Sequence, residues 1–304
     1  MKKLLLALFA FSAFFGITAC EEIEYILPDV LEVQLIPSRD AEVLDASRAP
    51  LEALLEEHLE MDVNVTIATD YNALIEGMAS EQIHVGLLAT TAYVLAHDEG
   101  AANVILKSLR YDVDDEGNEL TDQPLVDGYK SQLVVAADSG ITGVADLVGK
   151  TIAISSFTST SGFVWPANLL ADNGIDPETD VTWLNAGGHD NAILAILQGT
   201  ADAAFTFKDA RNLLREDYPD INEQVLFITD TTIIPNDTIS VIPRLDKDLV
   251  DRIQQAFLDI AADPDGLAIV DAIYSHKGYA IATDDEYDIV RTYLERQQDW
   301  DFGA

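Results

Sequence analysis

Short apolar runs typical of strands alternate with longer segments of helical periodicity, and this alternation limits the possible folds most. The strand-like runs at 31–36, 63–68, 85–88 and 104–109 are separated by segments with apolar residues at helical spacing. Strands and helices that alternate in this way are typical of mostly parallel sheets flanked by helices. The sequence therefore predicts an α/β protein.

The pattern stops at residues 112–127 and then resumes. This interval is polar and acidic and contains Gly117 and Pro124, so we expect an exposed loop. After residues 239–242 the tail of the chain reads as helical. The second series of strand-like runs lies between these two points, at 133–136, 151–154, 181–184, 203–207 and 225–228.

Two such series in a chain of 304 residues predict two lobes, because this length exceeds what one core usually holds. We expect residues 31–130 and 238–304 to form a discontinuous lobe 1, and residues 131–237 to form lobe 2. Ligands of open α/β sheets bind at the carboxyl ends of strands. Two lobes can bring those ends together in a cleft that closes by hinge motion.

The first twenty residues have the organisation of a lipoprotein signal. Lys2 and Lys3 precede an apolar run, which ends in Ile17-Thr18-Ala19-Cys20. A basic start, a short apolar run and small residues before the cleavage point are typical of a secretory signal. The last four residues resemble a lipobox. We expect residues 1–19 to be removed, Cys20 to carry acyl groups such as palmitate, and residues 20–30 to form a spacer.

Composition excludes several classes of protein. Seventeen Lys and Arg face 54 Asp and Glu, for a net charge of −37, so the field repels nucleic acid and no nucleic-acid partner is expected. Cys20 is the only cysteine, which rules out an intrachain disulfide. The five histidines have no metal-binding spacing, so we expect neither a metal site nor a cofactor.

A hydroxyl-rich turn follows the strand-like run at 151–154. Ser159, Thr160 and Ser161 precede Gly162 and an apolar helical segment, which puts them at a helix amino terminus. Free N–H groups and the helix dipole favour an anion there. Ordinary capping is the alternative, but one hydroxyl is enough for a cap.

The same segment resembles a known signature. Ser-Thr-Ser-Gly followed by an aromatic residue and a proline is similar to the motif of PhnD-like phosphonate-, phosphite- and phosphate-binding proteins, the solute-binding components of ABC importers. The similarity extends over residues 31–295. It implies a two-lobed type II periplasmic-binding-protein fold with its ligand between the lobes. Further matching segments are Asp70-Tyr71, Gly128-Tyr129-Lys130-Ser131, Gly188-His189-Asp190 and Pro235-Asn236-Asp237.

The resemblance also implies the site and the partners. A phosphorus oxyanion would be captured without catalysis and delivered to a membrane permease by a lipid-anchored, extracytoplasmic monomer. Asp209 and Asp237 occupy positions where a carboxylate can meet a ligand ammonium or a protonated P–OH group. The donors around the oxyanion would be Tyr71, Tyr129, Ser159, Thr160, Ser161 and His189.

Three alternatives remain open from the residues. A binding protein for another small solute, such as a sulfonate, would share the architecture. A hydrolase would use Ser161, His189 and Asp237, although the chain has no Gly-x-Ser-x-Gly nucleophile elbow. A structural surface lipoprotein would need neither the hydroxyl-rich turn nor the Gly-His-Asp turn.

Overall fold

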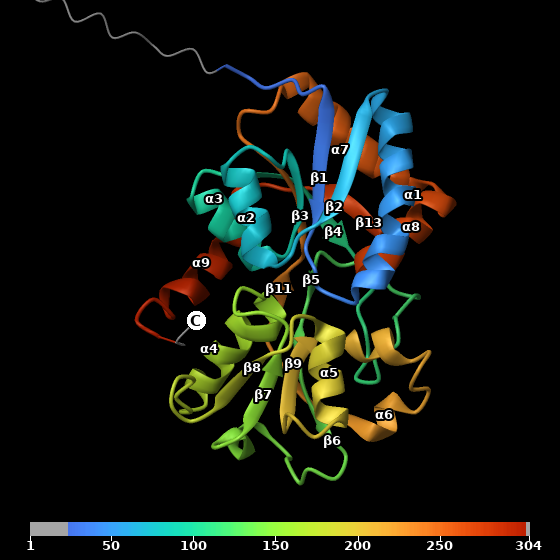
Figure 1. The fold of residues 1–304 in the computed structure, drawn as a ribbon. Helices are drawn as coiled ribbons and strands as arrows, with labels where there is room; N and C mark the ends of the chain where they lie inside the picture. The colour runs from blue at the N-terminus through green and yellow to red at the C-terminus, as the bar shows by residue number, and fades with distance from the viewer. Residues whose placement is uncertain (1–23, 302–304) are drawn as a thin grey trace, which may run out of the picture.

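Two separate β-sheets organise the protein, one in each half of the molecule (Figure 1). The computed structural model describes residues 24–301. The six-stranded sheet of lobe 1 has the order β13-β4-β12-β3-β1-β2, and the five-stranded sheet of lobe 2 has the order β10-β6-β9-β7-β8. The predicted two-lobed α/β class is confirmed.

Lobe 1 draws its strands from two distant stretches of the chain. Its strands are β1 (Val30–Leu35), β2 (Asp62–Ile67), β3 (Val85–Leu88), β4 (Asn103–Leu109), β12 (Thr238–Val241) and β13 (Gly278–Ile281). Its helices are α1 (Ala41–Leu59), α2 (Tyr71–Ala79), α3 (Thr90–Asp98), α7 (Lys247–Ala262), α8 (Pro264–Tyr274) and α9 (Asp288–Glu295).

Lobe 2 is built from one continuous stretch. Its strands are β6 (Ser131–Ala136), β7 (Thr151–Ile154), β8 (Thr182–Asn185), β9 (Ala203–Phe207) and β10 (Val225–Asp230). Its helices are α4 (Trp165–Asp172), α5 (His189–Leu197) and α6 (Ile221–Gln224). The two crossings between the lobes, β5 (Gly128–Tyr129) and β11 (Ile234–Pro235), pair with each other as antiparallel strands.

Both sheets are mixed, whereas the sequence predicted mostly parallel ones. In lobe 1, β1 pairs in parallel with β2 and β3, but β12 lies antiparallel between β3 and β4. In lobe 2, β7 pairs in parallel with β8 and β9, but β6 lies antiparallel between β9 and β10. The crossings are the cause, because β6 and β12 follow β5 and β11 directly. They therefore enter from the cleft, against strands that end there.

The tail is not all helical, which corrects the prediction for the end of the chain. Strand β13 pairs antiparallel with β4, and its buried Tyr279 packs on Phe257 of α7. The segment around α9 then reaches lobe 2. The Tyr293 ring stacks on Trp165 with centroids 4.2 Å apart, and Gln297 Nε2 donates to the Val164 carbonyl at 2.7 Å.

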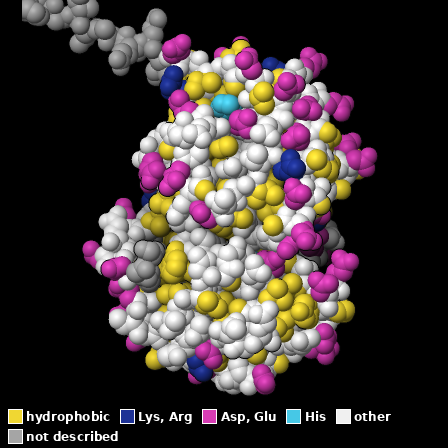
Figure 2. Space-filling view, in the orientation of Figure 1, with side chains coloured by type: hydrophobic (Ala, Val, Ile, Leu, Met, Phe, Trp, Pro, Cys, Tyr) yellow, Lys and Arg dark blue, Asp and Glu magenta, His cyan; other side chains and the backbone are white. Residues whose placement is uncertain are grey.

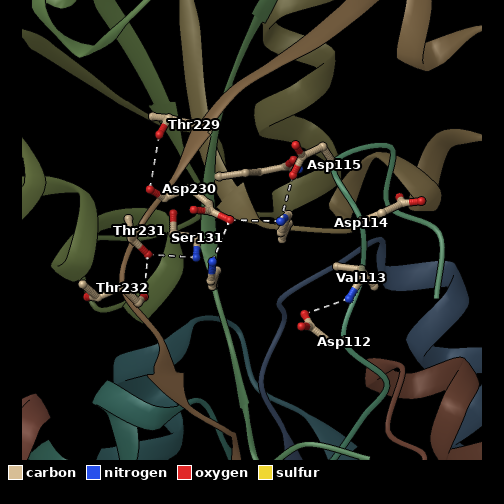
Figure 3. Close-up of polar contacts among 12 residues, drawn as sticks. Asp112, Val113, Asp114, Asp115, Ser131, Thr229, Asp230, Thr231 and Thr232 are labelled. Atoms are coloured by element: carbon tan, nitrogen blue, oxygen red, sulfur yellow. Dashed lines mark hydrogen bonds and ion pairs between the residues drawn. The ribbon is translucent and has the colours of Figure 1, made fainter. Parts of the chain in front are cut away.

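The acidic interval at 112–127 is largely exposed, as predicted, but it is also docked on lobe 2. Lys208 Nζ lies 3.0 Å from Asp115 and 2.9 Å from Asp230, and Lys130 Nζ lies 3.0 Å from Asp230 (Figure 3). Asn212 Nδ2 also donates to the Gly117 carbonyl at 2.7 Å. A segment that leaves and re-enters lobe 1 is thus held by side chains of lobe 2.

The described amino-terminal residues lie on lobe 1. Ile26 forms a bridge with Leu245. The described chain enters lobe 1 at the end remote from lobe 2 (Figure 1). The predicted signal peptide, Cys20 and the first part of the spacer lie outside the described residues. Within 24–301, no helix has the length and apolar character needed to cross a membrane.

Candidate functional site

A small cavity lies between the lobes, at the carboxyl ends of their strands. Lobe 1 and its crossings contribute aromatic, charged and small residues, and lobe 2 contributes hydroxyls, an imidazole and an aromatic ring. The lining consists of Ile36, Ser38, Arg39, Tyr71, Ala89, Arg110, Tyr129, Ser159, Ser161, His189, Phe207, Asp237 and Tyr274.

The hydroxyl-rich turn opens the helical segment that leads into α4. Ser159 caps it, since its Oγ accepts from Gly162 N at 3.1 Å and its carbonyl accepts from Phe163 N and Val164 N at 2.9 and 3.0 Å. The backbone N–H groups of Thr160 and Ser161 find no acceptor within residues 24–301. A Cβ on Gly162 would lie 2.7 Å from Ser155 Oγ and 2.9 Å from Ser159 Oγ, so a larger residue would displace the hydroxyls of this turn. Two free amides at a helix start can bind an anion.

The three predicted hydroxyls of this turn have different places. Ser159 and Ser161 line the cavity, and Ser131 Oγ donates to the Ser161 carbonyl at 2.6 Å. Thr160 is buried but does not line the cavity; its Oγ1 accepts from the Thr91 backbone N–H of α3. Thr160 thus connects the two lobes.

Both predicted tyrosines line the cavity. Asp70 caps α2 by accepting from Ala73 N at 2.9 Å, which makes Tyr71 the first residue of that helix. Burial and the charge of Asp237 raise the pKa of both Tyr71 and Tyr129, while nearby serine hydroxyls oppose the rise. Both phenols therefore stay protonated and can donate to an anion.

His189 is the first residue of α5 and is 3% exposed. Its Nε2 lies 3.3 Å from Ser155 Oγ, and its buried Nδ1 has no hydrogen-bond partner among the described residues. Burial lowers the pKa of His189 to about 3, although Asp237 opposes this shift. The imidazole is therefore neutral at physiological pH, with an unused nitrogen beside the cavity.

The two predicted carboxylates differ in position. Asp237 lines the cavity, and its buried Oδ1 has no partner among the described residues. Its Oδ2 lies 3.9 Å from His276 Nε2, which is too long for a hydrogen bond. Asp209 lies outside the lining, because it is paired with Arg110 through both carboxylate oxygens.

Two arginines at the cavity were missed by the sequence reasoning. Arg39 lies beyond the end of β1, and Arg110 directly follows β4. Burial lowers the pKa of Arg39, but a guanidinium remains charged at neutral pH. The sequence did contain a signal for these two arginines. Ligands bind at the carboxyl ends of strands, and both Arg39 and Arg110 follow the end of a strand. Tyr274, at the end of α8, had no comparable signal.

The cavity contrasts with the surface, where acidic side chains are scattered over both lobes (Figure 2). An anion that reaches the cavity meets Arg39 and neutral donors, with Asp237 as a carboxylate in the same lining. Among the described residues, no group of three His, Cys, Asp or Glu side chains is arranged to hold a metal ion.

Known proteins are similar to this chain in sequence. A family model described as "ABC transporter, phosphonate, periplasmic substrate-binding protein" matches residues 33–287. The phosphate-import protein PhnD of Mycolicibacterium smegmatis is 28% identical over 281 residues, or 87% of this chain and 84% of that protein. The phosphonates-binding periplasmic protein of Escherichia coli is 25% identical over 248 residues, or 80% of this chain and 70% of that protein.

Solved structures show the same fold. The binding protein component of an ABC phosphonate transporter from Pseudomonas aeruginosa superimposes with a TM-score of 0.77 at 19% identity, over 88% of this chain and 86% of that one. PhnD1 from Prochlorococcus marinus, in complex with methylphosphonate, gives a TM-score of 0.75 at 18% identity, over 89% and 98%. The family resemblance of the sequence is thereby confirmed, and the chain belongs to the periplasmic substrate-binding proteins of ABC phosphonate transporters, which are extracytoplasmic transport proteins.

Proposed function

We propose that this protein captures a small phosphorus oxyanion, namely a phosphonate, phosphite or phosphate, and delivers it to its permease. One observation carries the proposal. The amides of Thr160 and Ser161, which have no acceptor within residues 24–301, belong to a turn whose Ser159 and Ser161 line the cavity together with protonated tyrosines and a neutral histidine. Such neutral donors stabilise a buried anion by hydrogen bonds, without the cost of burying many fixed charges.

In this proposal the neutral donors bind different sides of the oxyanion. Ser159, Ser161 and the two amides bind one side of the oxyanion, and the hydroxyls of Tyr71 and Tyr129 bind the other. His189 donates from its unused nitrogen, and Arg39 supplies the positive charge that balances the anion. Asp237 accepts a hydrogen bond from a protonated P–OH group, which a fully ionised sulfate does not offer.

The lobes close around the ligand in this proposal. The boundaries 31–130 with 238–304 for lobe 1, and 131–237 for lobe 2, agree with the strands of each sheet and the paired crossings β5 and β11. Hinge motion at these crossings would open and close the cleft. The closed form would then dock on the permease, with the protein acting as a monomer.

Anchoring through Cys20 belongs to the same proposal. It is supported by the single cysteine after Ile17-Thr18-Ala19 and by the start of the described chain, which lies at the end of lobe 1 remote from the cleft (Figure 1). A tether there leaves the cleft free. Labelling intact cells with a palmitate analogue tests it, because Cys20→Ser should abolish incorporation.

We infer binding without catalysis. A hydrolase based on Ser161 would need the imidazole beside that hydroxyl, yet the serine hydroxyl within 3.3 Å of His189 belongs to Ser155. Hydrolysis of model phosphate esters, lost in Ser161→Ala, would contradict this inference.

A thermal-shift screen tests the ligand class. Phosphate, phosphite, methylphosphonate, 2-aminoethylphosphonate, sulfate and an alkyl sulfonate are compared at equal concentration, since a ligand that binds only the folded state raises the melting temperature. We expect phosphorus oxyanions to raise it and sulfur oxyanions to leave it unchanged. A larger shift with sulfonate than with every phosphorus compound would overturn the proposal.

A further inference from the structure

Arg110 separates the cavity from a second void. The neighbouring void is small, and its lining includes Arg110, Tyr129, Asp209, Lys130 and Lys208. Arg110 and Tyr129 line both spaces, whereas Asp209 lines only the second. The guanidinium therefore lies between the cavity and this carboxylate.

The Arg110–Asp209 pair joins the two lobes. Arg110 follows β4 of lobe 1, and Asp209 follows β9 of lobe 2. Arg110 Nη2 lies 3.2 and 3.1 Å from the two carboxylate oxygens, and the side chains are 10% and 9% exposed. A buried carboxylate requires a cationic partner, and here the protein itself supplies it.

Aromatic rings hold the guanidinium in this place. Its Cζ lies 5.6 Å from the ring centroid of Tyr129 and 5.7 Å from that of Phe207. These cation–π contacts, one from a crossing strand and one from lobe 2, fix Arg110 in addition to the ion pair.

We propose that Arg110 determines ligand specificity by occupying the place where a ligand ammonium would pair with Asp209. The inference deepens the proposed function and rests on it. The built-in cation blocks the second void and neutralises the carboxylate, so the site selects compact oxyanions, such as methylphosphonate, over those with a cationic aminoalkyl tail. Removing the Arg110 side chain joins the two spaces and frees Asp209 for such a tail, because the other cations of the second void, Lys130 and Lys208, are already paired with Asp230.

Calorimetry with methylphosphonate and 2-aminoethylphosphonate tests this assignment. We expect the wild type to bind methylphosphonate at least about tenfold more tightly, and Arg110→Ala to reverse the preference. The double variant Arg110→Ala/Asp209→Asn has the added space but lacks the carboxylate charge. It should therefore lose the increase in affinity for 2-aminoethylphosphonate that Arg110→Ala shows. It also avoids the unpaired buried carboxylate that destabilises the single variant.

The matched control is Arg296→Ala. Arg296 also forms an ion pair between the lobes, with Asp172, but it lies outside the cavity lining. It should leave the ratio of the two affinities unchanged.

The outcomes separate the two proposals. If the wild type binds no phosphorus oxyanion, the proposed function fails, and the specificity role of Arg110 fails with it. If the wild type binds methylphosphonate but binds 2-aminoethylphosphonate equally well, only the role of Arg110 is overturned. An unchanged preference in folded Arg110→Ala also overturns it.

Discussion

Thr160 Oγ1 accepts a hydrogen bond from the Thr91 backbone N–H at 2.9 Å, so the hydroxyl-rich turn of lobe 2 is tied to the first turn of α3 in lobe 1. The bond is buried and spans the cleft. It can form only when the lobes are close together. Thr160 therefore stabilises the closed form.

Replacing Thr160 with valine keeps the shape of the side chain and removes this bond. We expect Thr160→Val to weaken phosphonate binding by about 1 kcal/mol, because the closed form loses one net hydrogen bond. Thr160→Ser should stay near the wild type. Calorimetry measures both, and Thr158→Ala, on the same turn but outside the lining, is the control. Equal affinities for Thr160→Val and the wild type would contradict the role.

The neutral state of buried His189 predicts an acid-sensitive stability. Burial lowers its pKa from 6.5 to about 3 in the folded state. Below pH 6.5 the imidazole of His189 becomes protonated in the unfolded chain but stays neutral in the folded protein. The free energy of unfolding therefore falls as the pH falls towards 3. One such group contributes up to about 1.4 kcal/mol per pH unit.

The variant His189→Gln should therefore show a shallower loss of stability between pH about 6.5 and about 5. Urea unfolding followed by circular dichroism measures it. His58→Gln, at an exposed position on α1, is the control and should follow the wild type. The same slope for His189→Gln and the wild type would refute the buried neutral imidazole.

The hydroxyl of Tyr71 is predicted to donate to the ligand. We expect Tyr71→Phe to weaken phosphonate binding by about 1.5–3 kcal/mol, the range for a hydrogen bond to a charged group. Tyr93→Phe is the matched control, since the Tyr93 hydroxyl donates to Asp284 at 2.7 Å, outside the cavity lining. That variant should lose stability and keep its affinity. Unchanged affinity in Tyr71→Phe together with weakened affinity in Tyr93→Phe would show that Tyr71 does not bind the ligand.

Asp230 is the shared partner of Lys130 and Lys208 (Figure 3). Burial alone would raise the pKa of Asp230, but the hydrogen bonds from the two lysines lower it. We expect Asp230→Asn to lower the free energy of unfolding by about 1–3 kcal/mol, because it leaves two ammonium groups without their common carboxylate.

The control for this pair is Asp115→Asn, which removes a more exposed carboxylate from Lys208 alone. Its loss of stability should be below about 1 kcal/mol. Urea unfolding of both variants gives the comparison. A larger loss for Asp115→Asn than for Asp230→Asn would reverse the assigned order.

Local patterns in the sequence determined the elements and the family. The strands predicted at 85–88, 151–154 and 203–207 have the same bounds in the structure. They could be predicted because an apolar run and its flanking turns are encoded within a few neighbouring residues. The Ser159 to Gly162 turn was identifiable for the same reason. Its residues are neighbours in the chain, and the free amides follow from a helix starting there.

Only the tertiary structure decided which side chains meet across the cleft. The pairing of Asp209 with Arg110, the contact of Thr160 with Thr91, and the presence of Arg39 in the lining depend on how the two lobes are placed. The antiparallel entry of β6 and β12 likewise depends on the crossings. These contacts join residues far apart in the chain, and no local pattern specifies them, because burial and partner choice arise only when both lobes pack together.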